Sequence, residues 1–83
     1  MTGSIHTDAY RDLITRLAEA RVAAGLTQQA LADRLSKPQS YVAKVEGCER
    51  RLDVVEFLVM TKEIGTDPMP MIEAAWGRMN LPS

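Results

Sequence analysis

Hydrophobic residues recur along this chain at intervals of three and four residues, the spacing that places side chains on one face of an α-helix. The clearest case begins at Asp8, a suitable N-cap, and runs to Ala24, after which Gly25 ends it. No stretch alternates apolar and polar residues for long enough to predict a β-strand. We therefore expect an all-α protein, a compact five-helix domain without internal repeats.

Four further helices are predicted over residues 28–35, 39–46, 53–64 and 68–79. Each is bounded by residues that commonly begin or end helices. The residues that begin them are Thr27, Pro38, Asp67-Pro68 and the Asp53 and Glu56 of a capping box. Those that end them include Gly47 and Gly65. This division predicts one domain over residues 8–79, with a flexible N-terminal tail at 1–7 and a C-terminal tail at 80–83.

The composition is that of a single folded domain. The chain has 83 residues, of which 46% are hydrophobic and 25% charged, and these values exclude a disordered polar chain. It contains no apolar run of about 18 residues, so we expect no membrane span, and its N-terminus lacks the features of a secretory signal. Cys48 and His6 are the only cysteine and histidine, which excludes an internal disulfide and a Cys/His zinc site. We expect a cytoplasmic protein without cofactors.

Charge is distributed unevenly along the chain. The net charge is −1, yet residues 34–51 carry +3 and residues 52–83 carry −3. Salt screens charges beyond about 8–10 Å, so a local basic segment is sufficient to attract an anionic partner. An excess of three charges is also common on an ordinary solvated surface, so charge alone leaves both interpretations open.

Residues 27–46 contain two short helices joined by a short turn. Such helices cross steeply, which requires a small residue at the crossing and apolar residues on both sides of the junction. Ala32 is the small residue, and the apolar residues are Leu31, Leu35, Val42 and Val45. This combination resembles the helix-turn-helix of the lambda-repressor-like (Cro/C1, XRE) transcriptional regulators. The resemblance covers roughly residues 10–76.

Two positions depart from the family pattern. The family usually has glycine in the turn between the two helices, where the backbone is left-handed; this chain has Ser36, at a cost of about 1 kcal/mol. The family also often has glycine two residues after the glutamate that ends the third helix, whereas here the order is Glu46, Gly47, Cys48. This order predicts that the end of the helix is displaced by one residue. Neither departure removes the surface that would bind DNA.

The resemblance implies binding to the major groove of double-stranded DNA through the helix at residues 39–46, since an α-helix fits a groove about 12 Å wide. The residues that match base-contacting positions are Gln39, Ser40 and Lys44. The candidates for contact with the sugar-phosphate backbone are Gln28, Lys37, Tyr41, Arg50 and Arg51. Gln39 is the most selective of these, because its amide can form two hydrogen bonds to adenine.

Each candidate also has a purely structural interpretation. Glutamines on a helix commonly face solvent, Lys44 is placed to pair with Glu46 or solvent, and the two arginines at 50 and 51 can serve solubility alone. Cys48 is interpreted as an incidental thiol. The folded part has no histidine near a cysteine or serine, no glycine-rich phosphate loop and no metal-ligand spacing, so we expect no enzymatic activity.

The C-terminal part is richer in apolar residues than a core of this size can absorb. Residues 54–60 contain six apolar residues in seven, and four of the five methionines lie in the last 24 residues. Some of them must fill the core, but the excess predicts a patch that mates with a second copy. We assign this homodimer interface to Met60, Met71, Trp76 and Met79. The alternative for Trp76 is burial within its own subunit.

Two functions remain for the chain. The first is a sequence-specific transcriptional regulator, most simply a repressor, that binds a palindromic operator as a dimer and resides on the nucleoid when bound. The second is a protein-interaction or antitoxin-like module whose acidic C-terminal half binds another protein, with DNA binding secondary. Gln28, Gln39 and Lys44 favour the first, while the net negative charge and Ser36 leave room for the second.

Overall fold

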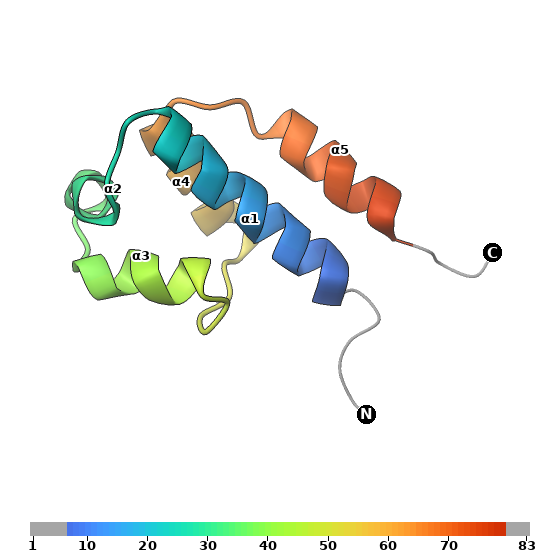
Figure 1. Cartoon of the computed structure of the whole chain (residues 1–83), viewed down its shortest axis with the longest axis horizontal. Helices are drawn as coiled ribbons and strands as arrows, with labels where there is room; N and C mark the ends of the chain where they lie inside the picture. Colours follow the sequence, from blue (N-terminus) through green and yellow to red (C-terminus); the bar gives the residue numbers. More distant parts are fainter. Residues whose placement is uncertain (1–6, 80–83) are drawn as a thin grey trace.

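The computed structural model describes residues 7–79, which contain five α-helices and no strand. The helices are α1 (Thr7–Ala23), α2 (Gln28–Leu35), α3 (Gln39–Glu46), α4 (Val54–Ile64) and α5 (Met69–Arg78). Figure 1 shows α1 and α5 side by side and antiparallel, with α2 and α3 toward one end of α1 and α4 behind it. The all-α, five-helix prediction is confirmed. His6 and the predicted tails lie outside the described residues, except that Thr7 begins α1.

A single hydrophobic core joins the five helices. Its buried members are Ile14, Leu17, Leu31, Ala32, Val42, Val45, Phe57, Met60, Ile64 and Met71. The four of these at the crossing of α2 and α3 are at most 1% exposed, and Leu35 is half-buried against them. Full burial of a Leu or Val side chain stabilises a fold by about 1.5–3 kcal/mol. The predicted filling of this junction is therefore confirmed, and it holds α3 at a set angle to α2.

The turn between α2 and α3 depends on a residue in the left-handed conformation. Thr27 begins α2 by accepting a hydrogen bond from the Ala30 N–H at 3.0 Å. Ser36 ends α2 with φ 57° and ψ 43°, and its N–H donates to the Asp33 carbonyl oxygen. The chain then reaches Pro38, the N-cap of α3. Serine takes the place of glycine in the turn, as expected, with the associated strain of about 1 kcal/mol.

The helix α3 ends at Glu46, in agreement with its predicted bounds, but the expected displacement of its end is not seen. Gly47 has an ordinary φ of −83°, and the left-handed residue is Cys48, with φ 60°. The helix end is therefore not displaced, because α3 ends at Glu46 and the left-handed residue comes two positions later, at Cys48. A side chain at position 47 would lie 3.3 Å from both the Ala43 carbonyl oxygen and the Glu49 carboxylate. Lack of space, rather than a special dihedral angle, favours glycine there.

The ends of α4 follow the predicted signals. Asp53 accepts from the Glu56 N–H at 2.7 Å and Glu56 accepts from the Asp53 N–H at 3.0 Å, so the predicted capping box is present. Gly65 ends the helix with φ 86°. At the other end of the chain, α1 begins at Thr7, so Asp8 lies in the first helical turn instead of capping it.

The helices are short. The longest is α1, with 17 residues, and none of the helices within residues 7–79 has both the length and the apolar character needed to cross a bilayer.

Candidate nucleic-acid interface

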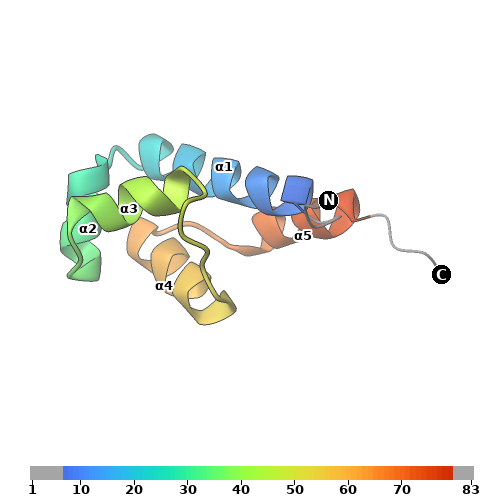
Figure 2. The same cartoon turned by 90° about the horizontal axis from the view of Figure 1, so that it is seen from below.

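The helix predicted to contact bases presents its polar residues outward. Val42 and Val45 of α3 are fully buried, so the opposite face of the helix is turned toward solvent. Gln39, Ser40 and Lys44 are all exposed. Figure 2, the view from below Figure 1, shows α3 in front of α1, with no helix covering it from that side. The three predicted base-contacting residues therefore share an accessible helix.

A chain of hydrogen bonds connects this surface to the interior. Arg21 of α1 pairs with Glu46 of α3, from Nε to Oε2 at 2.6 Å and from Nη2 to Oε1 at 3.1 Å. Glu46 Oε1 also accepts from Gln28 Nε2 at 2.9 Å, and Gln28 Oε1 accepts from Gln39 Nε2 at 2.7 Å. The side chains of Arg21 and Glu46 are only 13% and 12% exposed. These hydrogen bonds thus connect the largely buried Arg21–Glu46 ion pair to the exposed amide of Gln39.

The carboxylate of Glu46 determines the direction of these hydrogen bonds. An ionised carboxylate only accepts, so Gln28 must turn its NH₂ group toward it. The oxygen of Gln28 then faces Gln39, which must present one N–H in return. The second N–H and the oxygen of Gln39 are left for a partner outside this chain of bonds. The two glutamines therefore form one oriented unit.

Two more of the predicted residues, Lys37 and Arg50, lie over the aromatic ring of a third, Tyr41. The Lys37 ammonium lies 5.3 Å and the Arg50 guanidinium carbon 4.8 Å from the centre of the Tyr41 ring. Tyr41 is half-buried, and this burial raises the pKa of its phenol. The hydroxyl is therefore protonated at neutral pH and can donate a hydrogen bond to an anion. Lys37, Arg50 and Tyr41 together form a cationic cluster in which the Tyr41 hydroxyl is a neutral hydrogen-bond donor.

Arg50 is less available to an external anion than the sequence suggests. Its Nη2 donates to Glu56 Oε2 at 2.9 Å. That hydrogen bond, and then the one from the Asp53 N–H, lowers the pKa of the Glu56 carboxyl. Because this pKa is lowered, the two contacts stabilise the fold at pH values above the ordinary carboxyl pKa. The stabilisation is lost as the pH falls through the lowered pKa. At neutral pH the carboxylate offsets part of the Arg50 charge.

Arg51 is held by a different contact. Its guanidinium carbon lies 4.3 Å from the centre of the Tyr10 ring, and the Tyr10 hydroxyl accepts from the Leu52 N–H at 3.1 Å. These contacts tie the segment between α3 and α4 to α1. Arg51 is exposed and has no acidic partner within residues 7–79, so its charge is free to meet a phosphate.

Sequence reasoning missed Arg21 and placed Glu46 at the surface or beside Lys44. The two partners are 25 residues apart, and the pairing depends on how α1 and α3 cross. A signal was present: Arg21 lies four residues after the buried Leu17, and Glu46 lies four residues after the buried Val42. Opposite charges on two otherwise apolar helix faces indicate an internal ion pair.

Two of the four residues assigned to a dimer interface are not at the surface. Met60 and Met71 are 1% and 6% exposed and belong to the core, so their assignment to an interface is wrong. Each lies on the face of its helix that packs inward. Trp76 and Met79 are 78% and 41% exposed, so the alternative of a Trp76 buried in its own subunit is also wrong.

The steep α2–α3 pair with an exposed second helix defines a helix-turn-helix DNA-binding domain. The Helix-turn-helix family model matches residues 17–47, which contain α2, α3 and the end of α1. A solved structure of an XRE-family like protein from Pseudomonas syringae pv. tomato str. DC3000 is 47% identical to the chain. The match covers 92% of this chain and 93% of that chain, with a TM-score of 0.83. No curated protein matches.

The chain belongs to the XRE family of helix-turn-helix proteins, as the sequence resemblance predicted. Members of this family bind DNA and are not enzymes.

Proposed function

We propose that this protein is a sequence-specific transcriptional regulator that binds a palindromic operator as a homodimer and represses transcription. The observation that best supports specificity is the position of Gln39. It stands at the exposed N-terminal end of α3 and is held by Gln28 at 2.7 Å, in a direction imposed by Glu46. A side chain oriented before binding loses less conformational freedom when it meets a base.

Adenine is the base that best matches Gln39 in this orientation. In the major groove adenine offers a donor at N6 and an acceptor at N7. Gln39 retains one oxygen and one N–H, which complement these two groups. Ser40 can donate or accept and so discriminates weakly. Lys44, about one turn further along α3, is placed for guanine O6 or N7 or for a phosphate.

The surrounding residues are proposed to contact the sugar-phosphate backbone. Lys37, Tyr41 and Arg51 supply two cations and a neutral donor beside α3. Gln28 is the first residue of α2, where unpaired backbone N–H groups and the positive end of the helix dipole favour an anion. Such contacts set the register of α3 in the groove without carrying sequence information.

Repression is the simplest consequence of this binding. A dimer that covers two half-sites within a promoter excludes polymerase by steric overlap. The proposal is tested by selecting bound sequences from random duplexes at about 150 mM salt, a concentration at which non-specific phosphate binding is weakened. We expect enrichment of an imperfect palindrome. Selection without any enriched sequence would favour the protein-interaction module instead.

Gln39→Ala is expected to weaken binding to the selected site by about 1–3 kcal/mol and binding to random DNA much less, because base contacts carry the sequence information. Titration of both duplexes by fluorescence anisotropy measures the difference. Gln29→Ala is the matched control, since Gln29 is also an exposed glutamine but bonds to Asp33 on its own helix. Equal losses on both duplexes for Gln39→Ala would reduce Gln39 to a backbone contact.

The double variant Arg50→Ala/Arg51→Ala is expected to weaken selected and random DNA alike. The slope of affinity against salt should fall by about one unit for each phosphate that the variant no longer binds. Of the two single variants, Arg51→Ala should have the larger effect, because Glu56 already pairs with Arg50. Lys62→Ala removes a charge near the C-terminal end of α4 and serves as the control. An unchanged salt slope in the double variant would exclude both arginines from the interface.

A further inference from the structure

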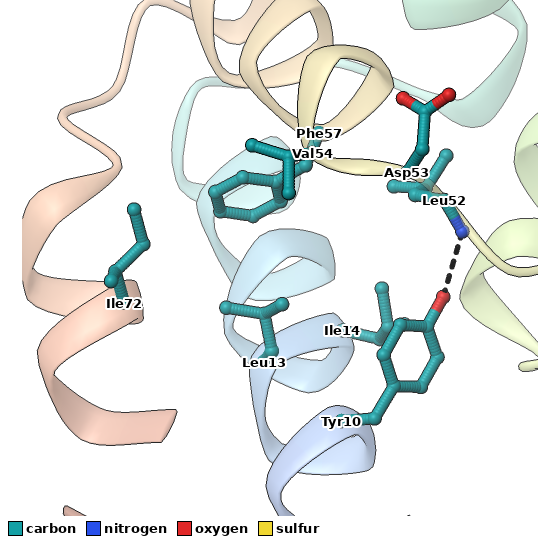
Figure 3. A pocket seen from close by; sticks show the side chains of 8 residues that line it. All are labelled: Tyr10, Leu13, Ile14, Leu52, Asp53, Val54, Phe57 and Ile72. Atoms are coloured by element: carbon teal, nitrogen blue, oxygen red, sulfur yellow. Dashed lines mark hydrogen bonds between the residues drawn. The ribbon is translucent and has the colours of Figure 1, made fainter. Parts of the chain in front are cut away.

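One side chain of α1, Tyr10, makes two contacts with the segment that joins α3 to α4. Its hydroxyl accepts from the Leu52 N–H at 3.1 Å, across 42 residues of sequence. The Arg51 guanidinium carbon lies 4.3 Å from the centre of the Tyr10 ring. Figure 3 shows the ring below Leu52, with the hydrogen bond between them drawn. Tyr10 therefore restrains the main chain of this segment and the side chain of Arg51 together.

Packing alone does not fix the Tyr10 ring. The ring borders an apolar hollow of about 300 Å³ between α1, α4 and α5, whose wall also includes Leu13 and Ile72. A side chain in a close-packed interior is restrained by neighbours on every side, whereas this ring has an open space on one side. The position of the ring therefore depends on the hydrogen bond to Leu52 and on the contact with Arg51.

The contact with Tyr10 leaves the hydrogen-bond donors of Arg51 available. An aromatic ring meets the flat face of a guanidinium, whereas the five N–H donors lie in the guanidinium plane. Two of these donors match two oxygens of a phosphate. Within residues 7–79 the Arg51 side chain has no acidic partner, and its contact is with the Tyr10 ring. Arg51 is thus held in place without being neutralised.

The neighbouring arginine has a different part in the same segment. Arg50 Nη1 donates to the Arg51 carbonyl oxygen at 3.1 Å, and Arg50 Nη2 donates to the Glu56 carboxylate at 2.9 Å. The two terminal nitrogens of Arg50 are therefore engaged within the domain. Arg50 helps to build the segment, and Arg51 is the arginine that the segment presents to solvent.

We propose that Tyr10 is a positioning residue for DNA binding, which holds Arg51 in the orientation in which it meets a phosphate. The inference rests on the proposed function for the identity of the anion, a phosphate of double-stranded DNA. Tyr10 precedes residues 17–47, which match the family model, so this support comes from outside the helix-turn-helix. Immobilising one more long side chain on binding lowers affinity by about 2–12-fold, and Tyr10 removes that cost for Arg51.

A double-mutant cycle tests this role. Tyr10→Leu should weaken binding to the selected duplex and to random duplexes alike, by about 2–12-fold, because phosphate contacts carry no sequence information. In the Arg51→Ala background the same substitution should have no further effect, since no guanidinium is then left to hold. Fluorescence anisotropy at one salt concentration measures the four affinities. Losses that simply add in the double variant would overturn the proposal.

The dependence of affinity on salt separates positioning from loss of charge. Arg51→Ala should lower the salt slope by about one unit. Tyr10→Leu should leave the slope unchanged, because the Arg51 charge still reaches the phosphate in the complex. A slope that falls in Tyr10→Leu as far as in Arg51→Ala would contradict a positioning role.

Tyr10→Phe separates the two contacts of the tyrosine. It retains the ring beside Arg51 and loses the hydroxyl that accepts from Leu52, so its loss of affinity should be smaller than that of Tyr10→Leu. Equal losses would show that the ring contact has no part in holding Arg51, against the proposal. If Tyr10→Leu does not fold by circular dichroism, the cycle of Tyr10→Phe with Arg51→Ala applies the same criterion.

Leu13→Ala is the matched control for damage to α1. Leu13 lies on the same helix, borders the same hollow and packs against the core, but it has no part in the two contacts of Tyr10. The variant should lower the free energy of unfolding and leave the DNA affinity of the folded protein unchanged. A loss of affinity as large as in Tyr10→Leu would mean that a weakened α1, and not the orientation of Arg51, impairs binding.

Random duplexes keep this test separate from the test of the proposed function. If selection enriches no sequence, the specific regulator is refuted, whereas coupling between Tyr10 and Arg51 on random DNA still supports the positioning role. If selection enriches a palindrome but the two losses add, the regulator stands and the role of Tyr10 is refuted.

Discussion

Glu46→Ala is expected to destabilise the domain by about 3–5 kcal/mol, the range for removing one member of a buried ion pair. The variant leaves the Arg21 guanidinium, only 13% exposed, without its carboxylate, and it also removes the acceptor that orients Gln28. Denaturant unfolding followed by circular dichroism measures the loss. A loss below about 1 kcal/mol would mean that the pair behaves like an ordinary surface ion pair.

Glu46→Gln separates the stability of the pair from its orienting effect. The amide has nearly the same shape and can still accept from Arg21, so the free energy of unfolding should fall less than in Glu46→Ala. An amide can also donate, however, so it no longer forces Gln28 to present its NH₂ group. We therefore expect Glu46→Gln to lower discrimination between the selected site and random DNA.

The double variant Arg21→Met/Glu46→Leu should recover much of the stability lost in Glu46→Ala, because neither charge is then left unpaired.

Local signals predicted the fold well because they act within a few residues. Thr27 caps α2, and the Asp53 and Glu56 pair caps α4, through bonds that span three residues. Ser36 adopts the left-handed turn expected for it. Such features are set by chain geometry close to the residue concerned, so the sequence alone is sufficient to place them.

The surfaces were harder to predict because they depend on which face of a helix the rest of the fold covers. The sequence shows the excess of apolar residues over 54–60. The interface prediction, however, placed Met60 at the surface, and Met60 is buried. Phe57, Met60 and Ile64 recur at three- and four-residue intervals and form the buried face of α4. The valines Val54, Val55 and Val59 are left exposed instead. Periodicity would have separated the two sets, whereas the general adaptability of methionine did not.

The candidate DNA-binding residues show the same division. Gln39, Ser40 and Lys44 follow from their positions on a helix and are exposed as expected. The orientation of Gln39 depends on Arg21, which lies on α1 and comes near only after the helices pack. The electrostatic availability of Arg50 likewise depends on Glu56, which belongs to the next helix. The positions of these residues on the helix follow from the sequence pattern. The orientation of the Gln39 amide and the availability of the Arg50 charge follow from tertiary contacts.

Trp76→Glu is expected to weaken binding to the full palindrome by about 10²–10⁴-fold, the advantage gained when two linked sites bind together. Because Trp76 is 78% exposed, the variant should remain folded by circular dichroism. Its affinity for a single half-site should be unchanged, since α3 lies apart from this end of α5 in Figure 1. Electrophoretic mobility shifts on the two duplexes measure both values.

The same dimer predicts the geometry of the operator. Two recognition helices on one face of the duplex require half-site centres about 10 bp apart, or a multiple of that, which corresponds to about 34 Å. Inserting about 5 bp between the half-sites turns one of them to the opposite face of the DNA, so the unaltered protein should lose the affinity that Trp76→Glu loses. The insertion should have little further effect on Trp76→Glu, because a monomer binds each half-site independently. A folded, dimeric Trp76→Glu with unaltered operator binding would show that α5 does not join the two copies.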